Sequence, residues 1–251
     1  MTWRRDWRIL AVVIAALLVA GVWAVTLVSK PRPPAADGRA DASASRTSSV
    51  TPAVVVGDSL ATVTAPAGPN IAFPKVMARL LGWRLNVQAH PDTGFTTPAG
   101  LDAQHPSFAA TVRTVVAADP RVVIVALGSD DAERAGPGHV VQSTATEGLA
   151  DLHRRLPGAR IVVVGPLPSG STRSPALQAV RDAVRAAAQA ARVVFIDPIG
   201  EGWITGDRTD PWSGNAAQTI SADGRHLTPA GHAYVGLQLA TDLSRLGVAS
   251  R

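Results

Sequence analysis

VTPAVVVGDSLATV, Val50 to Val63, contains a short valine run that stops abruptly at Gly57-Asp58-Ser59. Continuous runs of β-branched residues are typical of strands buried on both faces of a sheet, so the stretch predicts a buried strand over Ala53–Gly57. Serine commonly caps the first turn of a helix, and a serine at a strand-to-helix turn can also be a nucleophile. The stretch alone leaves both interpretations of Ser59 open.

Further Val/Ile runs follow along the chain, with helical segments between them. The runs cover Arg121–Gly128, Ala159–Pro168 and Ala191–Pro198, and Gly82–Ala89 is a weaker candidate. The segments that predict helices are Phe73–Leu81, Ala109–Ala118, Thr146–Leu156, Ser174–Ala190 and Pro229–Leu246. Strands that alternate with helices predict a parallel sheet covered by helices on both sides. Ligands bind at the carboxyl ends of the strands in such sheets, so the polar residues after each run form the candidate site.

The composition limits the classes of function. The 251-residue chain is 46% hydrophobic, which is enough for a sizeable core, and it has no cysteine, which excludes disulfides, thiolate metal sites and cysteine catalysis. The net charge is +5, but residues 1–30 carry +3 of it and the rest of the chain is nearly neutral. This distribution argues against a nucleic-acid partner. The histidines follow no metal-ligand spacing, and we expect no metal and no cofactor.

The N-terminus carries a long apolar segment. Ile9 to Val28 is a run of 20 uncharged, mostly apolar residues, and about 20 helical residues cross a bilayer core. Arg4, Arg5 and Arg8 precede the run, so the positive-inside bias places the N-terminus in the cytoplasm. A cleaved signal peptide is the alternative, although its apolar region is usually about 7–15 residues. We therefore expect the following domain outside the cytoplasm, anchored by a single membrane-spanning helix or secreted.

The chain divides into three predicted parts. Residues 1–29 form a cytoplasmic stub and transmembrane anchor, or a signal peptide. Residues 30–49 are rich in Pro, Ala, Ser and Asp and contain no large apolar residue, which is typical of a disordered tether. Residues 50–251 form the folded domain.

Asp223 and His226 stand three residues apart in SADGRHLTPAGHAYVG, Ser221 to Gly236. On a glycine-containing turn, a carboxylate can reach the imidazole three residues later and hold one ring nitrogen so that the other faces outward as a base. Ser59 needs such a base, because a hydroxyl alone is a weak nucleophile. Chain order does not show that the pair meets Ser59. An ordinary turn aspartate and a surface histidine are the alternative.

Four spaced blocks resemble the SGNH (GDSL) hydrolases. They are GDSL at Gly57–Leu60, Gly94 in PDTGFTT, GSDD at Gly128–Asp131 and DGRH at Asp223–His226, within a resemblance that covers about Val54 to Leu246. The resemblance implies a three-layer, flavodoxin-like α/β/α domain with a parallel sheet that hydrolyses or transfers esters. It implies that Ser59 is the nucleophile, His226 the general base and Asp223 the residue that orients it. It also implies an oxyanion hole made by the N–H groups of Ser59 and Gly94 and the side chain at Asp130.

Asp130 departs from the family pattern, whose third block is Gly-x-Asn-Asp. An asparagine amide donates to a developing oxyanion, whereas an ionised aspartate only accepts and repels it. In one interpretation Asp130 is protonated in a poorly solvated site, with Asp131 close by raising its pKa. In a second, two backbone donors suffice for a slow enzyme, and in a third the domain has lost hydrolysis and kept binding. We expect the first two together.

The sequence therefore predicts a serine esterase that cleaves O-acyl esters of lipid or carbohydrate in the cell envelope through an acyl-enzyme on Ser59. An acyltransferase with the same Ser59, His226 and Asp223 is one alternative, and a non-catalytic envelope-binding domain is another. Trp203 and Trp212 lie in a long loop ahead of Asp223. We expect them either to line an acyl or sugar pocket or to staple this loop to the domain.

Overall fold

The computed structural model describes residues 50–62, 69–134, 137–168 and 174–249. The membrane anchor and the tether, which were predicted for residues 1–49, lie outside this part of the chain. Among the helices that the structure describes, none combines the length and the apolar character needed to span a bilayer.

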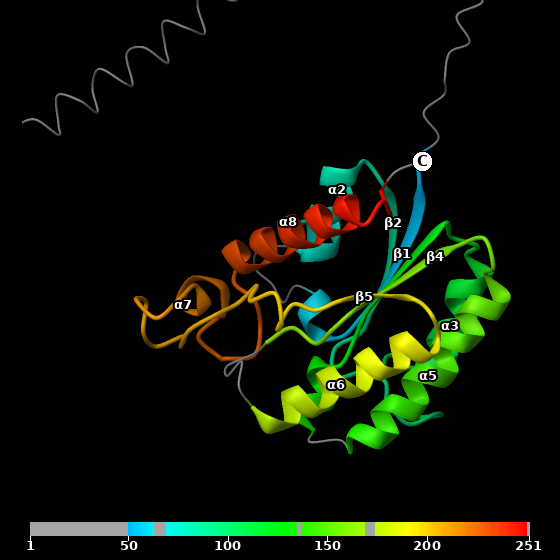
Figure 1. Cartoon of the computed structure of the whole chain (residues 1–251), viewed down its shortest axis with the longest axis horizontal. Coiled ribbons are helices and arrows are strands. Elements are labelled where there is room, and N and C mark those ends of the chain that lie inside the picture. The colour runs from blue at the N-terminus through cyan, green and yellow to red at the C-terminus, as the bar shows by residue number, and fades with distance from the viewer. Residues whose placement is uncertain (1–49, 63–68, 135–136, 169–173, 250–251) are drawn as a thin grey trace, which may run out of the picture. The chain divides into compact units, whose positions relative to one another are not determined.

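A parallel sheet forms the centre of the described residues (Figure 1). Its strands are β1 (Pro52–Gly57), β2 (Arg84–Ala89), β3 (Val122–Ala126), β4 (Arg160–Val164) and β5 (Val194–Ile196). The strand order is β2-β1-β3-β4-β5, and every neighbouring pair is parallel. The predicted parallel α/β architecture is therefore confirmed, and this strand order is the flavodoxin-like one.

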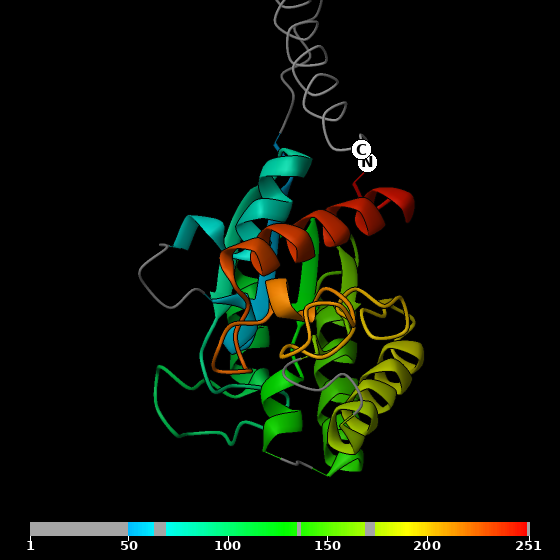
Figure 2. The same ribbon diagram turned by 90° about the vertical axis from the view of Figure 1, so that its left-hand side faces the viewer.

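Helices cover both faces of the sheet (Figures 1 and 2). The α-helices are α2 (Phe73–Leu81), α3 (Phe108–Ala117), α4 (Ser129–Glu133), α5 (Gly138–Arg155), α6 (Pro175–Ala190), α7 (Ala216–Thr219) and α8 (Pro229–Arg245), and the 3-10 turns are η1 (Ser59–Ala61) and η2 (Pro69–Ile71). Helices α2 and α8 contribute to one hydrophobic cluster, and α3, α5 and α6 to the other. The sequence did not predict α4 and α7, because helices this short show no apolar period.

The valine run of β1 is continuous because it serves both clusters. Successive side chains of a strand point to opposite faces of the sheet. Val55 accordingly packs in the cluster that contains Met77 and Leu239, whereas Val54 packs in the cluster that contains Phe108. All three positions from Val54 to Val56 are at most 2% exposed.

Helix α8 approaches α2 closely at its first turns. A Cβ atom at Gly236 would lie 2.6 Å from the Cβ of Val76, so glycine permits this contact. The buried His232 accepts a hydrogen bond through Nδ1 from the N–H of Phe73 at 3.3 Å. Burial lowers the pKa of His232 to about 4, so the ring stays neutral and acts as an acceptor. These contacts fix the start of α8, which directly follows the turn with Asp223 and His226.

Candidate active site

Ser59 lies at the carboxyl end of β1, where the strand order changes direction between β1 and β3. This is the position at which open parallel sheets bind ligands. Asp58 is the N-cap of the following turn, because its Oδ1 accepts a hydrogen bond from the N–H of Leu60 at 3.1 Å. The helix-cap interpretation of Ser59 is therefore wrong, and the capping role belongs to Asp58.

Asp58 also joins the ends of β1 and β3. Its Oδ2 accepts a hydrogen bond from the N–H of Ser129 at 3.0 Å, in the turn that starts α4. Burial and the neighbouring Asp130 raise the pKa of Asp58 to about 8. The two backbone hydrogen bonds give Asp58 a structural role beneath the site.

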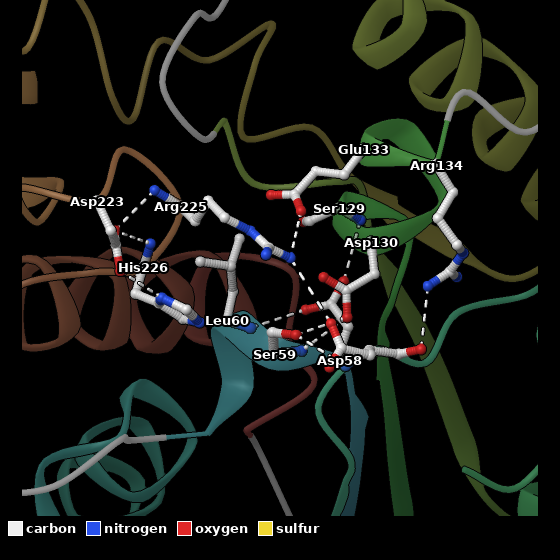
Figure 3. Close-up of polar contacts among 11 residues, drawn as sticks. Asp58, Ser59, Leu60, Ser129, Asp130, Glu133, Arg134, Asp223, Arg225 and His226 are labelled. Carbon is white, nitrogen blue, oxygen red and sulfur yellow. Dashed lines mark hydrogen bonds and ion pairs between the residues drawn. The ribbon is translucent and has the colours of Figure 1, made fainter.

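The hydroxyl of Ser59 has two close partners (Figure 3). Its Oγ donates to Oδ2 of Asp130 at 2.7 Å and accepts from the N–H of Asp92 at 3.0 Å. The N–H of Ser59 donates to the same Asp130 oxygen at 3.2 Å. Within the described residues, the ring of His226 makes no hydrogen bond with this hydroxyl. In this resting arrangement, Asp130 holds both the hydroxyl and the N–H of Ser59.

Asp130 has a raised pKa. Burial is the main cause and the charge of Glu133 adds to it, while the hydrogen bonds from Ser59 act in the opposite direction. Asp131 was expected to contribute, but its carboxylate faces another loop. It accepts from the N–H groups of Phe95 and Thr96, each at 2.9 Å. The principal charge that raises the pKa of Asp130 is therefore that of Glu133.

Gly94 lies in the same loop, but its N–H is directed at Thr97 and not at Ser59, whereas an oxyanion donor would face Ser59. Its N–H donates to Oγ1 of Thr97 at 2.7 Å. A Cβ atom at Gly94 would lie 2.2 Å from Oδ2 of Asp131, so the glycine gives that carboxylate room to bind the loop. The N–H that faces Ser59 belongs to Asp92, which has a φ of 55°. The sequence signal for Asp92 was only the turn-forming PDTG stretch, since aspartate tolerates this conformation better than most residues.

The structure brings Asp223 and His226 together, as their spacing predicts. Nδ1 of His226 lies 2.7 Å from Oδ2 of Asp223, and the N–H groups of Arg225 and His226 donate to Oδ1 at 2.8 and 3.0 Å. Burial alone would raise the pKa of Asp223, but the hydrogen bonds from Ser221, His226 and Arg225 hold it well below its usual range. Asp223 is thus an anion that orients the imidazole.

Two charged residues absent from the sequence prediction enter this region. Arg225 extends from the turn of Asp223 and His226 toward α4 (Figure 3). Its Nη2 lies 2.5 Å from Oε2 of Glu133 and 3.7 Å from Oδ1 of Asp92. No sequence pattern marks these contacts, because Arg225 has no implied role inside the DGRH block, Glu133 lies outside the four blocks, and both side chains are partly exposed.

The two loop tryptophans differ in their surroundings. Trp203 is 1% exposed and donates through Nε1 to Oε2 of Glu201 at 3.1 Å, so it staples the loop. Trp212 is 94% exposed. Within the described part of the chain, no group of three or more His, Asp or Glu side chains is arranged to hold a metal ion.

Comparison with known proteins identifies relatives along most of the domain. The model of the GDSL-like lipase/acylhydrolase family matches residues 55–234. A GDSL lipase of Mycobacterium tuberculosis is 28% identical over 200 residues, which cover 77% of this chain and 81% of the relative.

Solved structures share the fold at lower identity. The carbohydrate acetylesterase Est24 of Sinorhizobium meliloti superposes with a TM-score of 0.56 at 16% identity, over 78% of this chain and 99% of that one. The salicylyl-acyltransferase SsfX3 of a tetracycline biosynthetic pathway gives a TM-score of 0.61 at 16% identity, over 80% of this chain and 56% of that one.

Proposed function

The chain belongs to the GDSL-like lipase/acylhydrolase family and is an ester-hydrolysing enzyme, and from this premise we propose that it cleaves O-acyl esters through an acyl-enzyme on Ser59. The observation that carries the proposal is the 2.7 Å contact between Asp223 and Nδ1 of His226. This contact fixes the ring so that Nε2 is the nitrogen that takes a proton. Among the described histidines, only His226 both has a carboxylate on a ring nitrogen and lies in one of the four blocks that resemble the family.

The first step transfers the Ser59 proton to His226 as Oγ attacks the ester carbonyl. The hydroxyl donates to Asp130 at rest, so it rotates about the Cα–Cβ bond toward His226 before the attack. Asp223 stabilises the imidazolium that forms. His226 then protonates the leaving alcohol, and water activated by the same ring releases the acyl group from Ser59.

The oxyanion of the tetrahedral intermediate has two backbone donors in this proposal, the N–H groups of Ser59 and Asp92. The second donor is Asp92 in place of Gly94, because the N–H of Asp92 faces Ser59, whereas that of Gly94 is directed at Thr97. Neutral Asp130 supplies a third donor, its carboxyl O–H. The raised pKa of Asp130 supports this role, since it keeps the acid neutral over a wider pH range.

The substrate class follows from the predicted location of the domain. An N-terminal anchor would hold the enzyme at the outer side of the membrane, where O-acylated lipids and carbohydrates of the envelope are the available esters. The fold is compatible with either outcome of the acyl-enzyme, because it is shared with a carbohydrate acetylesterase and an acyltransferase. We favour hydrolysis, and transfer to a sugar hydroxyl is the alternative.

A fluorophosphonate probe and a p-nitrophenyl ester series from short to long acyl chains test the assignment. We expect wild-type protein to be labelled and to turn over esters, and Ser59→Ala and His226→Ala to lose both activities. Ser143→Ala, at an exposed serine of α5, is the matched control. Folded wild-type protein that takes no label would contradict the acyl-enzyme and favour a binding domain. Faster product release with added sugar acceptors would indicate transfer.

The anchor has a separate test. We expect the protein in the membrane fraction, with residues 1–29 retained in the mature chain. We also expect the domain to be accessible to protease added outside the cell. A mature N-terminus after residues 22–24 would instead indicate cleavage of a signal peptide.

A further inference from the structure

Arg225 connects three segments of the site. Its backbone N–H donates to Oδ1 of Asp223 at 2.8 Å, so its main chain is part of the turn that orients His226. Its guanidinium reaches Oε2 of Glu133 at 2.5 Å and lies 3.7 Å from Oδ1 of Asp92. Glu133 belongs to α4, and the N–H of Asp92 contacts the nucleophile. One side chain therefore links the loop of the base to both segments that surround Ser59 (Figure 3).

The turn that carries His226 is anchored at its base by other contacts. Ile220 and Leu227 form an antiparallel bridge, and the N–H of Ser221 donates to the carbonyl of His226 at 2.8 Å. These bonds join the turn to itself and to the start of α8. The side chains of Asp223 and Arg225 at the tip are 48% and 49% exposed. The contact with Glu133 crosses from this tip to the opposite side of the site.

The charges around Arg225 favour a bridge over an anion-binding role. The carboxylates of Glu133, Asp130 and Asp92 all favour the charged guanidinium, and Glu133 has the largest effect on the pKa of Arg225. A substrate anion at this arginine would meet these carboxylates at short range. The guanidinium is already committed to protein partners.

We propose that Arg225 is a positioning residue of the ester-cleaving reaction, whose ion pair with Glu133 holds the His226 turn at the distance from Ser59 that proton transfer requires. The inference rests on the proposed roles of Ser59 and His226. Proton transfer depends steeply on geometry, whereas a half-exposed ion pair contributes little to overall stability. Loss of the bridge should therefore lower kcat while the fold and substrate binding stay intact.

A double-mutant cycle tests this bridge in the full-length enzyme with p-nitrophenyl acetate. We expect Arg225→Ala and Glu133→Gln each to lower kcat about tenfold with little change in KM. The double variant should be no slower than either single variant, because both changes remove one contact. Arg225→Lys should recover most of the rate. The melting temperature should fall by less than about 3 °C in each variant.

Arg208→Ala is the matched control, because Arg208 approaches the same turn at Gly224 but belongs to a separate loop. We expect its kcat to stay at the wild-type value. A kcat of Arg225→Ala within twofold of wild type would overturn the inference. So would multiplied losses in the double variant, or a rise in KM confined to anionic esters. If His226→Ala kept its activity, the proposed function itself would fail, which is a different result from loss of the bridge alone.

Discussion

Replacement of Asp131 by alanine should destabilise the domain strongly. The carboxylate is 0% exposed and accepts hydrogen bonds from the N–H groups of Phe95 and Thr96, each at 2.9 Å, and from the Thr96 hydroxyl. The hydroxyl can turn to another acceptor, but the two N–H groups cannot. Each buried N–H left without an acceptor costs about 1–3 kcal/mol. We therefore expect a loss of about 2–6 kcal/mol in the free energy of unfolding.

Urea and thermal unfolding measure this loss. For a domain of about 200 residues, each kcal/mol lowers the melting temperature by roughly 2–4 °C, so Asp131→Ala should melt at least about 4 °C below wild type. Asp131→Asn keeps one acceptor oxygen and should lose about half as much. Asp182→Ala removes a carboxylate that is 67% exposed and should change stability by less than about 0.5 kcal/mol. If Asp131→Ala matched that surface control, Asp131 would not hold the loop.

Three other perturbations address the electrostatics and backbone of the site. At a pH above the raised pKa of Asp130, its carboxylate repels the oxyanion and slows the wild-type enzyme. The kcat/KM of Asp130→Asn, divided by that of wild type, should therefore rise about tenfold or more as the pH increases. A ratio that stays constant over roughly pH 5–9 would show that Asp130 is not part of the oxyanion hole. Asp58 has a pKa of about 8 in the folded state against an ordinary value of 3.8, so between these values the folded state keeps a proton that the unfolded state has lost, and stability falls as pH rises. Asp58→Asn should flatten that fall in urea titrations, and parallel slopes would refute the shift. Glycine adopts a φ of 55° easily, so Asp92→Gly should keep kcat within about threefold of wild type. A β-branched valine does not, so Asp92→Val should lower kcat at least about tenfold. Equal kcat values for the two variants would show that the N–H of residue 92 does not stabilise the oxyanion.

The sheet could be predicted because burial on both faces leaves a direct mark on the sequence. The run before Ser59 became β1, and the runs predicted at Arg121–Gly128 and Ala159–Pro168 contain β3 and β4. The predicted extent was less accurate where polar residues dominate. Helix α5 begins at Gly138, well before the predicted start at Thr146, because much of its first half faces solvent. Strand β5 covers only Val194–Ile196, because Ala191 caps α6, Arg192 has a left-handed φ of 55°, and Pro198 beyond its end lacks an N–H for the ladder.

The candidate site was predictable where local spacing decides the contact. Asp223 and His226 meet because a short turn joins them. The N–H that approaches Ser59 was not predictable, because it depends on the left-handed backbone of Asp92 and not on a glycine. The ion pair of Arg225 with Glu133 was not predictable for another reason. A long, partly exposed side chain can take many directions, and only the tertiary arrangement selects one of them.

The close contact between α2 and α8 has a consequence for how distant segments of the sequence support catalysis. Ser59 lies just after β1, the first described strand, whereas His226 precedes α8, the last helix that the structure describes. The sheet and the helices of the opposite face involve residues that precede α8 in the chain. The contacts of Gly236 and His232 with α2 thus fix α8 and, with it, the turn that carries His226. A substitution in the contact between α2 and α8 would therefore act on catalysis through the position of this turn, although its residues do not touch Ser59.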